Sequence, residues 1–330
     1  MQPNPGLLFA AKPSPSFLFV KLKKNAGRSP VWKEKAGKTF RLRQKMREKA
    51  AEDTRIMKDW IILRGGGDLA TGAVQCLWRA GFKPLILEAP EPLAIRREVA
   101  LSEAVYEGLW EVEDLTAEYC PAALSAIEDV FSRGRIPIIT DPEAAILQDV
   151  SPEILVDAII AKKNLGTAIR MGRLGTIALG PGFCAGKDVD IVIETMRGHN
   201  LGRLIFEGEA APNTGTPGII QGKSAERVIH APCSGILRAV RKIGDVVEKG
   251  ESIAEIDGTP VPASLDGVLR GLIRPGLRVE KGLKIADIDP RISERKNCFT
   301  ISDKSRALGG AVLEAVMILK KKARDKKETA

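Results

Sequence analysis

A cluster of glycines that could bind a phosphate follows a short apolar run of strand length. Gly65, Gly67 and Ala70 have the G-x-G-x-x-A spacing that leads from a strand into a helix in dinucleotide-binding folds. Such glycines let backbone N–H groups approach a phosphate at the helix N-terminus. Glu88 follows about 20 residues later, where an acid would bind a ribose 2′-hydroxyl. The alternative is that the glycines only make a tight turn. The cofactor-binding residues predicted in this stretch are Gly65, Gly66, Gly67, Ala70, Gly72 and Glu88.

A second glycine-rich stretch runs from Gly180 to Lys187 and looks like a P-loop at first sight. The spacing is wrong, because Pro181 occupies the position of the first glycine and Asp188 replaces the Ser/Thr that holds magnesium. We expect a loop at the carboxyl end of a strand, where ligands of open α/β sheets bind, with Gly180 and Gly182 lining it.

Cys184 lies in this stretch and is a candidate nucleophile, with His199 as its candidate base. Nothing in the sequence brings the two together, and a partly buried thiol without a catalytic role is the alternative. Whether the protein is an enzyme is left open. The chain has two histidines and no C-x-x-C pair, so no metal site is predicted.

A third loop is rich in groups that bind anions. Arg197, His199, Asn200 and Arg203 follow a predicted strand within seven residues, so this loop is either an anion- or pterin-type recognition surface or a plain solvated connection. Lys162-Lys163-Asn164 raises the same question. We expect the loops 180–186 and 197–203 to form one wall of the cleft whose other wall is the glycine cluster.

The elements that must position these loops are strands alternating with helices. Helical spacing runs from Leu69 to Ala80 and from Ala122 to Ser132. The alternation predicts an α/β fold with a Rossmann-like, doubly wound parallel sheet. Strands are expected at 61–63, 83–88, 136–140, 154–160, 175–179, 191–195 and 203–206.

The sequence pattern changes after residue 228, where short apolar runs alternate with glycine turns. The stretch repeats itself at a spacing of about 32 residues, so that Gly235 aligns with Gly267 and Val247-Glu248-Lys249-Gly250 with Val279-Glu280-Lys281-Gly282. Two such halves resemble the barrel-sandwich hybrid of biotinyl and lipoyl domains. The hairpin at 257–262 has no lysine, so no covalent biotin or lipoate is expected. A helix is predicted from Asp303 to Lys322.

The charge of the chain is unevenly distributed. The net charge is +9, but residues 1–57 alone carry a surplus of ten positive charges. The remainder is balanced, which argues against a nucleic-acid partner. No apolar run approaches the length of a membrane span, and the scattered cysteines fit a cytoplasmic protein. The predicted domains are a basic, disordered extension (1–56, with Met57 as an alternative start), the α/β domain (57–227), the duplicated module (228–290), and a helix with a basic tail (291–330).

Taken in order, several motifs resemble the accessory family of the selenium-dependent molybdenum hydroxylase system. The stretches that carry the resemblance are 64–72, 157–167, 179–183, 197–203, 213–215 and 301–304. The resemblance implies a factor for maturation of xanthine-dehydrogenase-type enzymes. Its implied partners are such a hydroxylase or its cofactor-assembly proteins, and its implied ligand is the molybdenum cofactor, labile selenium or a dinucleotide. The alternatives are a nucleotide-dependent oxidoreductase and a non-catalytic docking protein.

Overall fold

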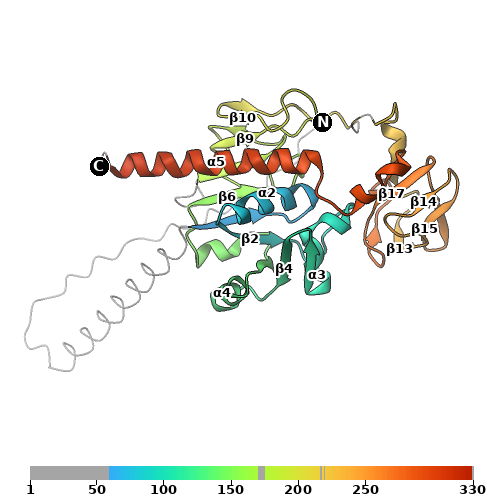
Figure 1. The fold of residues 1–330 in the computed structure, drawn as a ribbon, viewed down its shortest axis with the longest axis horizontal. Helices are drawn as coiled ribbons and strands as arrows, with labels where there is room; N and C mark the ends of the chain where they lie inside the picture. The colour runs from blue at the N-terminus through green and yellow to red at the C-terminus, as the bar shows by residue number, and fades with distance from the viewer. Residues whose placement is uncertain (1–58, 170–174, 216–217, 219, 329–330) are drawn as a thin grey trace, which may run out of the picture. The chain divides into compact units, whose positions relative to one another are not determined.

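The computed structural model describes residues 59–169, 175–215, 218 and 220–328 (Figure 1). The basic extension predicted at 1–56 lies outside these residues. All the elements below belong to one compact unit.

A large sheet forms the centre of the α/β part and contains nine strands in the described residues. Strand β1 is buried along its whole length because its apolar side chains face packed layers on both sides of the sheet. The pairs β4–β5, β5–β2, β2–β1, β1–β6, β6–β7 and β7–β9 are parallel, whereas the edge strands β10 and β3 pair antiparallel with their neighbours. In spatial order the strands are β10 (Leu204–Ile205), β9 (Ile191–Ile193), β7 (Gly175–Leu179), β6 (Ile154–Asp157), β1 (Trp60–Arg64), β2 (Lys83–Glu88), β5 (Ile136–Thr140), β4 (Leu115–Tyr119) and β3 (Leu109–Val112).

Helices cover this sheet unequally. On one face α2 lies beside the long helix α5, and both contribute to a single apolar core with the strands (Figure 1). On the other face α4 packs against β1, β2 and β5 in a second core. The α-helices are α2 (Asp68–Arg79), α3 (Ala104–Glu107), α4 (Leu124–Ser132) and α5 (Asp303–Glu328), and the short 3₁₀ helices are η2 (Arg97–Val99), η3 (Leu101–Glu103), η4 (Ala145–Gln148), η5 (Ala225–Arg227) and η6 (Ile292–Cys298).

Close packing of α5 on α2 depends on small residues. The Ser305 hydroxyl donates to the Asp68 carbonyl at 2.7 Å and accepts from the Gly72 N–H at 3.1 Å. A Cβ on Gly309 would lie 2.8 Å from Cys76 Sγ and closer still to the Gly72 carbonyl. The helix predicted at the end of the chain therefore completes the core of the α/β part.

The duplicated stretch folds into two antiparallel sheets of four strands each, with a core of its own. One sheet has the order β12 (Val228–His230), β19 (Lys284–Asp289), β17 (Gly267–Leu272), β14 (Val246–Val247), and the other β16 (Thr259–Pro262), β15 (Ser252–Ile256), β13 (Gly235–Ala239), β18 (Arg278–Val279). Strands β17, β18 and β19 each begin 32 residues after β13, β14 and β15. The short strands are exchanged, because β14 pairs with β17 and β18 with β13.

The predicted fold class needs correction. The sheet is mixed rather than wholly parallel, and in the described residues no α-helix connects β6, β7 and β9, so it is not doubly wound. A two-stranded sheet of β8 (Cys184–Ala185) and β11 (Gly208–Glu209) follows instead. The prediction of a biotinyl/lipoyl-like module is corrected as well, to two four-stranded sheets that exchange short strands. Short strands with glycine turns do not by themselves specify one fold.

Candidate functional site

The glycine turn between β1 and α2 is held tightly by its neighbours. Gly65 has a φ of 94°, and a Cβ there would lie 3.0 Å from the backbone of Ile159. Its N–H donates to the Leu87 carbonyl at 2.8 Å. Gly67 is the N-cap of α2, has no side-chain cap, and faces open space. The turn therefore brings the ends of β1, β2 and β6 together, as a ligand crevice of an α/β sheet requires.

Glu88 already has backbone partners in this turn. Its two carboxylate oxygens accept from the Gly66 N–H at 2.7 Å and the Ala89 N–H at 2.8 Å. Burial raises the pKa of Glu88 above its usual range, and the two backbone hydrogen bonds oppose that shift. A second carboxylate, Asp68, lies in the first turn of α2 and is 3.4 Å from Arg96. The glycine turn is therefore surrounded by negative charge, which disfavours a phosphate at this helix N-terminus.

A cavity of about 480 Å³ opens beside the glycine turn, and we call it the glycine-turn cavity. Gly65 and Glu88 line it, whereas Ala70 and Gly72 are buried in α2, where Gly72 packs against Ser305. Its lining comprises Arg64, Gly65, Leu87, Glu88, Ala89, Pro142, Glu143, Ile159, Asn164, Leu165 and Gly166.

The loop after β6 separates this cavity from a second one. Arg64, nearly fully buried, fixes the loop by donating to Thr167 Oγ1 at 2.6 Å and to the Leu165 carbonyl at 3.1 Å. On the other side the loop packs against the second glycine stretch, because a Cβ on Gly182 (φ 107°) would lie 2.7 Å from the Lys163 backbone. Gly180 approaches Thr195 Oγ1 in the same way. The structure thus brings the loops at 162–164 and 180–182 together.

The second cavity, of about 320 Å³, lies where β6, β7 and β9 end, and we call it the lysine cavity. Two of its residues, Ile160 and Lys162, have positive φ angles of 58° and 63°. Such a conformation is costly for a β-branched residue and tends to occur at functional sites. Its lining comprises Ile160, Lys162, Pro181, Thr195, Met196, Arg197, Ala211, Pro212, Asn213, Thr214, Gly218 and Lys304.

Glu194 organises two walls of the lysine cavity. This buried side chain accepts from the Met196 N–H at 2.7 Å and from the Ala211 N–H at 2.8 Å, which joins the loop after β9 to the segment that follows β11. No arginine or lysine among the described residues lies within ion-pair distance of it. Its role is therefore to shape the backbone of the cavity.

Lys304 enters the lysine cavity from the first turn of α5. Within the described part of the chain its ammonium group forms no hydrogen bond and no ion pair. Burial, followed by the proximity of Arg197, lowers the pKa of Lys304, and the carboxylates of Asp68, Glu194 and Asp303 oppose this shift only in part. The cavity thus contains a cation that its own walls do not neutralise.

Arg197 is the predicted residue that the structure places most clearly in a site. Its guanidinium makes a two-point ion pair with Asp303, at 2.7 and 3.0 Å, and it lines both the lysine cavity and a neighbouring one. Asn200 and Arg203 are exposed and line none of the three cavities described here.

The candidate nucleophile and base are not brought together. Cys184 pairs in strand β8 and its N–H donates to Asp188 at 2.8 Å, whereas His199 is exposed in the turn after β9. No hydrogen bond joins them. Across the described ranges no group of three or more His, Cys, Asp or Glu side chains could hold a metal ion. Nor does any described helix have the length and apolarity to cross a membrane.

Comparison with known proteins gives one strong sequence match. The chain is 48% identical over 259 residues to the uncharacterized protein YqeB of Escherichia coli (strain K12), covering 78% of this chain and 47% of YqeB. The chain thus spans about half the length of the curated relative that it matches. No protein-family model matches the chain.

Solved structures give only weak matches. The ectoine utilization protein EutE (DoeB) from Ruegeria pomeroyi is 12% identical, with 69% of this chain and 56% of that chain covered and a TM-score of 0.19. A succinylglutamate desuccinylase/aspartoacylase from Rhodobacter sphaeroides is 14% identical, with 69% and 84% covered and a TM-score of 0.22. At these TM-scores the likeness supports no conclusion about fold or activity.

The comparisons contradict the family predicted from the motifs. None of the names that the comparisons give points to a selenium-dependent molybdenum hydroxylase system. The predicted maturation function, with its oxidoreductase and docking alternatives, is corrected accordingly. The structure supplies a physical reason, because several motif residues have packing roles: Gly65 against Ile159, Gly72 against Ser305, and Gly182 against Lys163.

Proposed function

We propose that this protein binds a small anionic molecule in the lysine cavity. The observation that carries the proposal is the ammonium group of Lys304, which lines the cavity without a neutralising partner among the described residues. A cation withdrawn from water is costly unless an opposite charge is close to it. A bound carboxylate or phosphate would provide that charge.

The surroundings of Lys304 support the same ligand class. Lys162 and Arg197 add two cationic side chains, and Thr195 and Asn213 add groups that can form hydrogen bonds to the remainder of a ligand. The volume of about 320 Å³ is at the small end of the range for small-molecule sites. The strained backbone at Ile160 and Lys162 is the kind of cost that a binding loop retains.

The glycine-turn cavity is a poorer candidate for an anion. Glu88 and Glu143 place two carboxyl groups in its lining, and the Gly66 N–H that a phosphate would need is donated to Glu88. The cofactor role of Gly65, Gly66, Gly67, Ala70, Gly72 and Glu88 therefore stays a prediction. A cytoplasmic location is also part of our proposal, supported by five cysteines that are all free.

Calorimetric titration with sodium phosphate and sodium acetate at matched ionic strength tests the proposal. Lys304→Gln should weaken anion binding by about tenfold or more, since it removes a charge-assisted hydrogen bond. Lys321→Gln, an exposed lysine of the same helix, is the matched control and should bind as the wild type does. Lys304→Arg should recover part of the affinity. If wild-type protein binds neither anion, or Lys304→Gln binds as well as the control, the proposal fails.

A further inference from the structure

A third cavity, of about 510 Å³, has four arginines in its lining, and we call it the arginine cavity. It adjoins the first turn of α5 and strand β17, and it shares Arg197 with the lysine cavity. Its charged lining residues are Arg197, Arg270, Arg291, Arg306, Glu113 and Asp303. The lining therefore has two more positive than negative side chains, which favours an anion.

Arg270 is the least satisfied of these arginines. Its side chain is 14% exposed, its Nε is buried without a hydrogen-bond partner, and the acid within ion-pair distance of it among the described residues is Asp287, at 3.5 Å. A guanidinium has five N–H donors, and leaving them unpaired in a partly buried place is costly. Arg270 is thus a binding group without a described hydrogen-bond acceptor.

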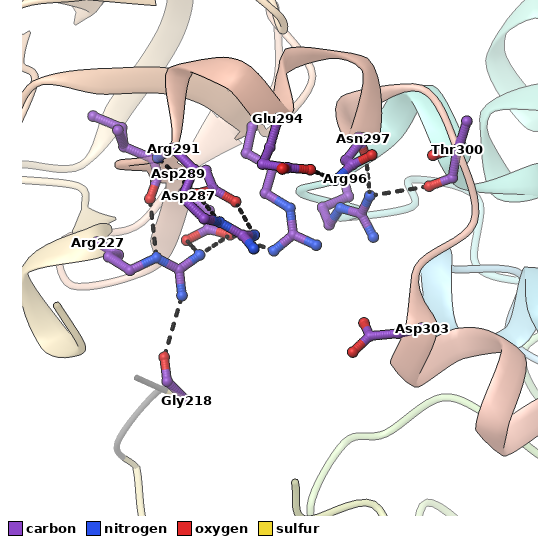
Figure 2. A network of polar contacts seen from close by, with 12 residues as sticks. Arg96, Gly218, Arg227, Asp287, Asp289, Arg291, Glu294, Asn297, Thr300 and Asp303 are labelled. Atoms are coloured by element: carbon purple, nitrogen blue, oxygen red, sulfur yellow. Dashed lines mark hydrogen bonds and ion pairs between the residues drawn. The ribbon is translucent and has the colours of Figure 1, made fainter. Parts of the chain in front are cut away.

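The carboxylates around Arg270 are already engaged by other groups. Asp287 accepts two hydrogen bonds from Arg227, at 3.2 and 3.3 Å. Asp289 accepts from the N–H and guanidinium of Arg291. Figure 2 shows these two pairs side by side, with Asp303 at some distance from them on α5.

Two further acids of the cavity are engaged as well. Glu113 accepts from the Gln75 amide at 2.8 Å and from the Ile301 N–H at 2.8 Å. Asp303 holds Arg197. Asp287 is therefore shared between Arg227 and Arg270, and the other three carboxylates are engaged by other groups.

Arg270 also lies close enough to two neighbouring arginines to repel them. Burial, and then the proximity of Arg270, lowers the pKa of Arg96, whose guanidinium donates only to backbone carbonyls and, at 3.4 Å, to Asp68 (Figure 2). The pKa of Arg227 is lowered by burial, and Arg270 adds to that shift while Asp287 opposes it. An anion beside Arg270 would relieve both effects.

We propose that the arginine cavity is a second binding site, and that it takes the phosphate group of a small organic phosphate through Arg270. Guanidinium groups bind phosphate in a two-point geometry, and a phosphate dianion matches the excess of two charges in the lining. The volume exceeds what a single phosphate needs, which leaves room for an organic part. This site does not depend on the proposed role of Lys304.

The test is calorimetric titration with phenyl phosphate, with benzoate at the same ionic strength as the carboxylate counterpart. Arg270→Gln should weaken phenyl phosphate binding at least about tenfold. The internal repeat provides a matched control, because Arg238 occupies the equivalent strand position in the other half and is exposed. Arg238→Gln should bind like the wild type.

The stability of the free protein separates a binding role from a structural one. Since Asp287 is shared with Arg227 and the Nε of Arg270 has no hydrogen-bond partner, Arg270→Gln should leave the melting temperature unchanged or raise it, and should abolish the rise caused by phenyl phosphate. A lowered melting temperature with unchanged binding would show that Arg270 only supports Asp287, and would overturn the proposal. So would equal binding of benzoate, or no binding by the wild type. Lys304→Gln should keep this site, so its failure and that of the lysine cavity are distinguishable.

Discussion

Two neighbouring glycines of α5 should respond in opposite directions when each is replaced by alanine. Both lie inside the helix, so alanine brings each the same gain in helix propensity, about 0.5–1 kcal/mol. A Cβ on Gly310 meets nothing within 4 Å, so Gly310→Ala should be more stable than the wild type.

Gly309 differs because its Cβ would lie in the contact between α5 and α2. The Cβ would lie 2.8 Å from Cys76 Sγ and closer to the Gly72 carbonyl, which is helix backbone and yields little. Overpacking of this kind costs about 1–3 kcal/mol. Set against the propensity gain, Gly309→Ala should lose roughly 1 kcal/mol, and the two variants should differ by about 2 kcal/mol.

Equilibrium unfolding in urea, followed by far-UV circular dichroism, measures this difference. Thermal unfolding should separate the variants by roughly 4–8 °C, given the usual dependence of melting temperature on free energy for a domain of this size. Because the first turn of α5 carries Lys304, Gly309→Ala should also weaken anion binding, whereas Gly310→Ala should not. Equal stability of the two variants would refute the close contact between α2 and α5.

Three further outcomes are expected. The ammonium group of Lys304 is fully present below its lowered pKa and is lost as pH rises through that pKa. Anion affinity should therefore decline at a lower pH than an ordinary lysine would give. An anion affinity that does not change with pH would exclude Lys304 from binding. Asp303→Asn should tighten phosphate binding by about threefold to tenfold, because Arg197 loses a competing carboxylate, and calorimetry would show the reverse if Asp303 mainly positions Arg197. After co-expression with biotin and lipoyl ligases, intact-mass measurement should show no added group, because the hairpin of β15 and β16 offers no lysine; a stoichiometric adduct on Lys249 or Lys281 would contradict this.

The strands were the most predictable part of the fold. The runs at 83–88, 136–140 and 175–179 coincide with β2, β5 and β7, because buried parallel strands have continuous apolar sequences. The hairpin of β3 and β4 was missed, since its acidic residues interrupt any apolar run. The predicted wholly parallel sheet was wrong for this reason and because β10 reverses direction at the other edge.

The candidate site was less predictable, because its residues are far apart in the sequence. Arg197 was identified from its short loop of polar groups. Lys304 lies more than a hundred residues further on, in α5. No local sequence pattern indicates that this helix packs on α2. Arg270 was visible only as the repeat partner of Arg238, and the sequence could not show that one is exposed and the other partly buried.

The packing of α5 on the sheet and α2 also has a consequence for folding during translation. The core that contains β1 and α2 includes Leu308, Val312 and Val316 of α5, although these residues are synthesised some 240 residues later. During translation one apolar face of the nine-stranded sheet must therefore stay uncovered until the two four-stranded sheets between it and α5 have left the ribosome. We expect nascent chains that stop before α5 to bind chaperones that hold unfolded apolar surface, and to be released once Leu319 has emerged.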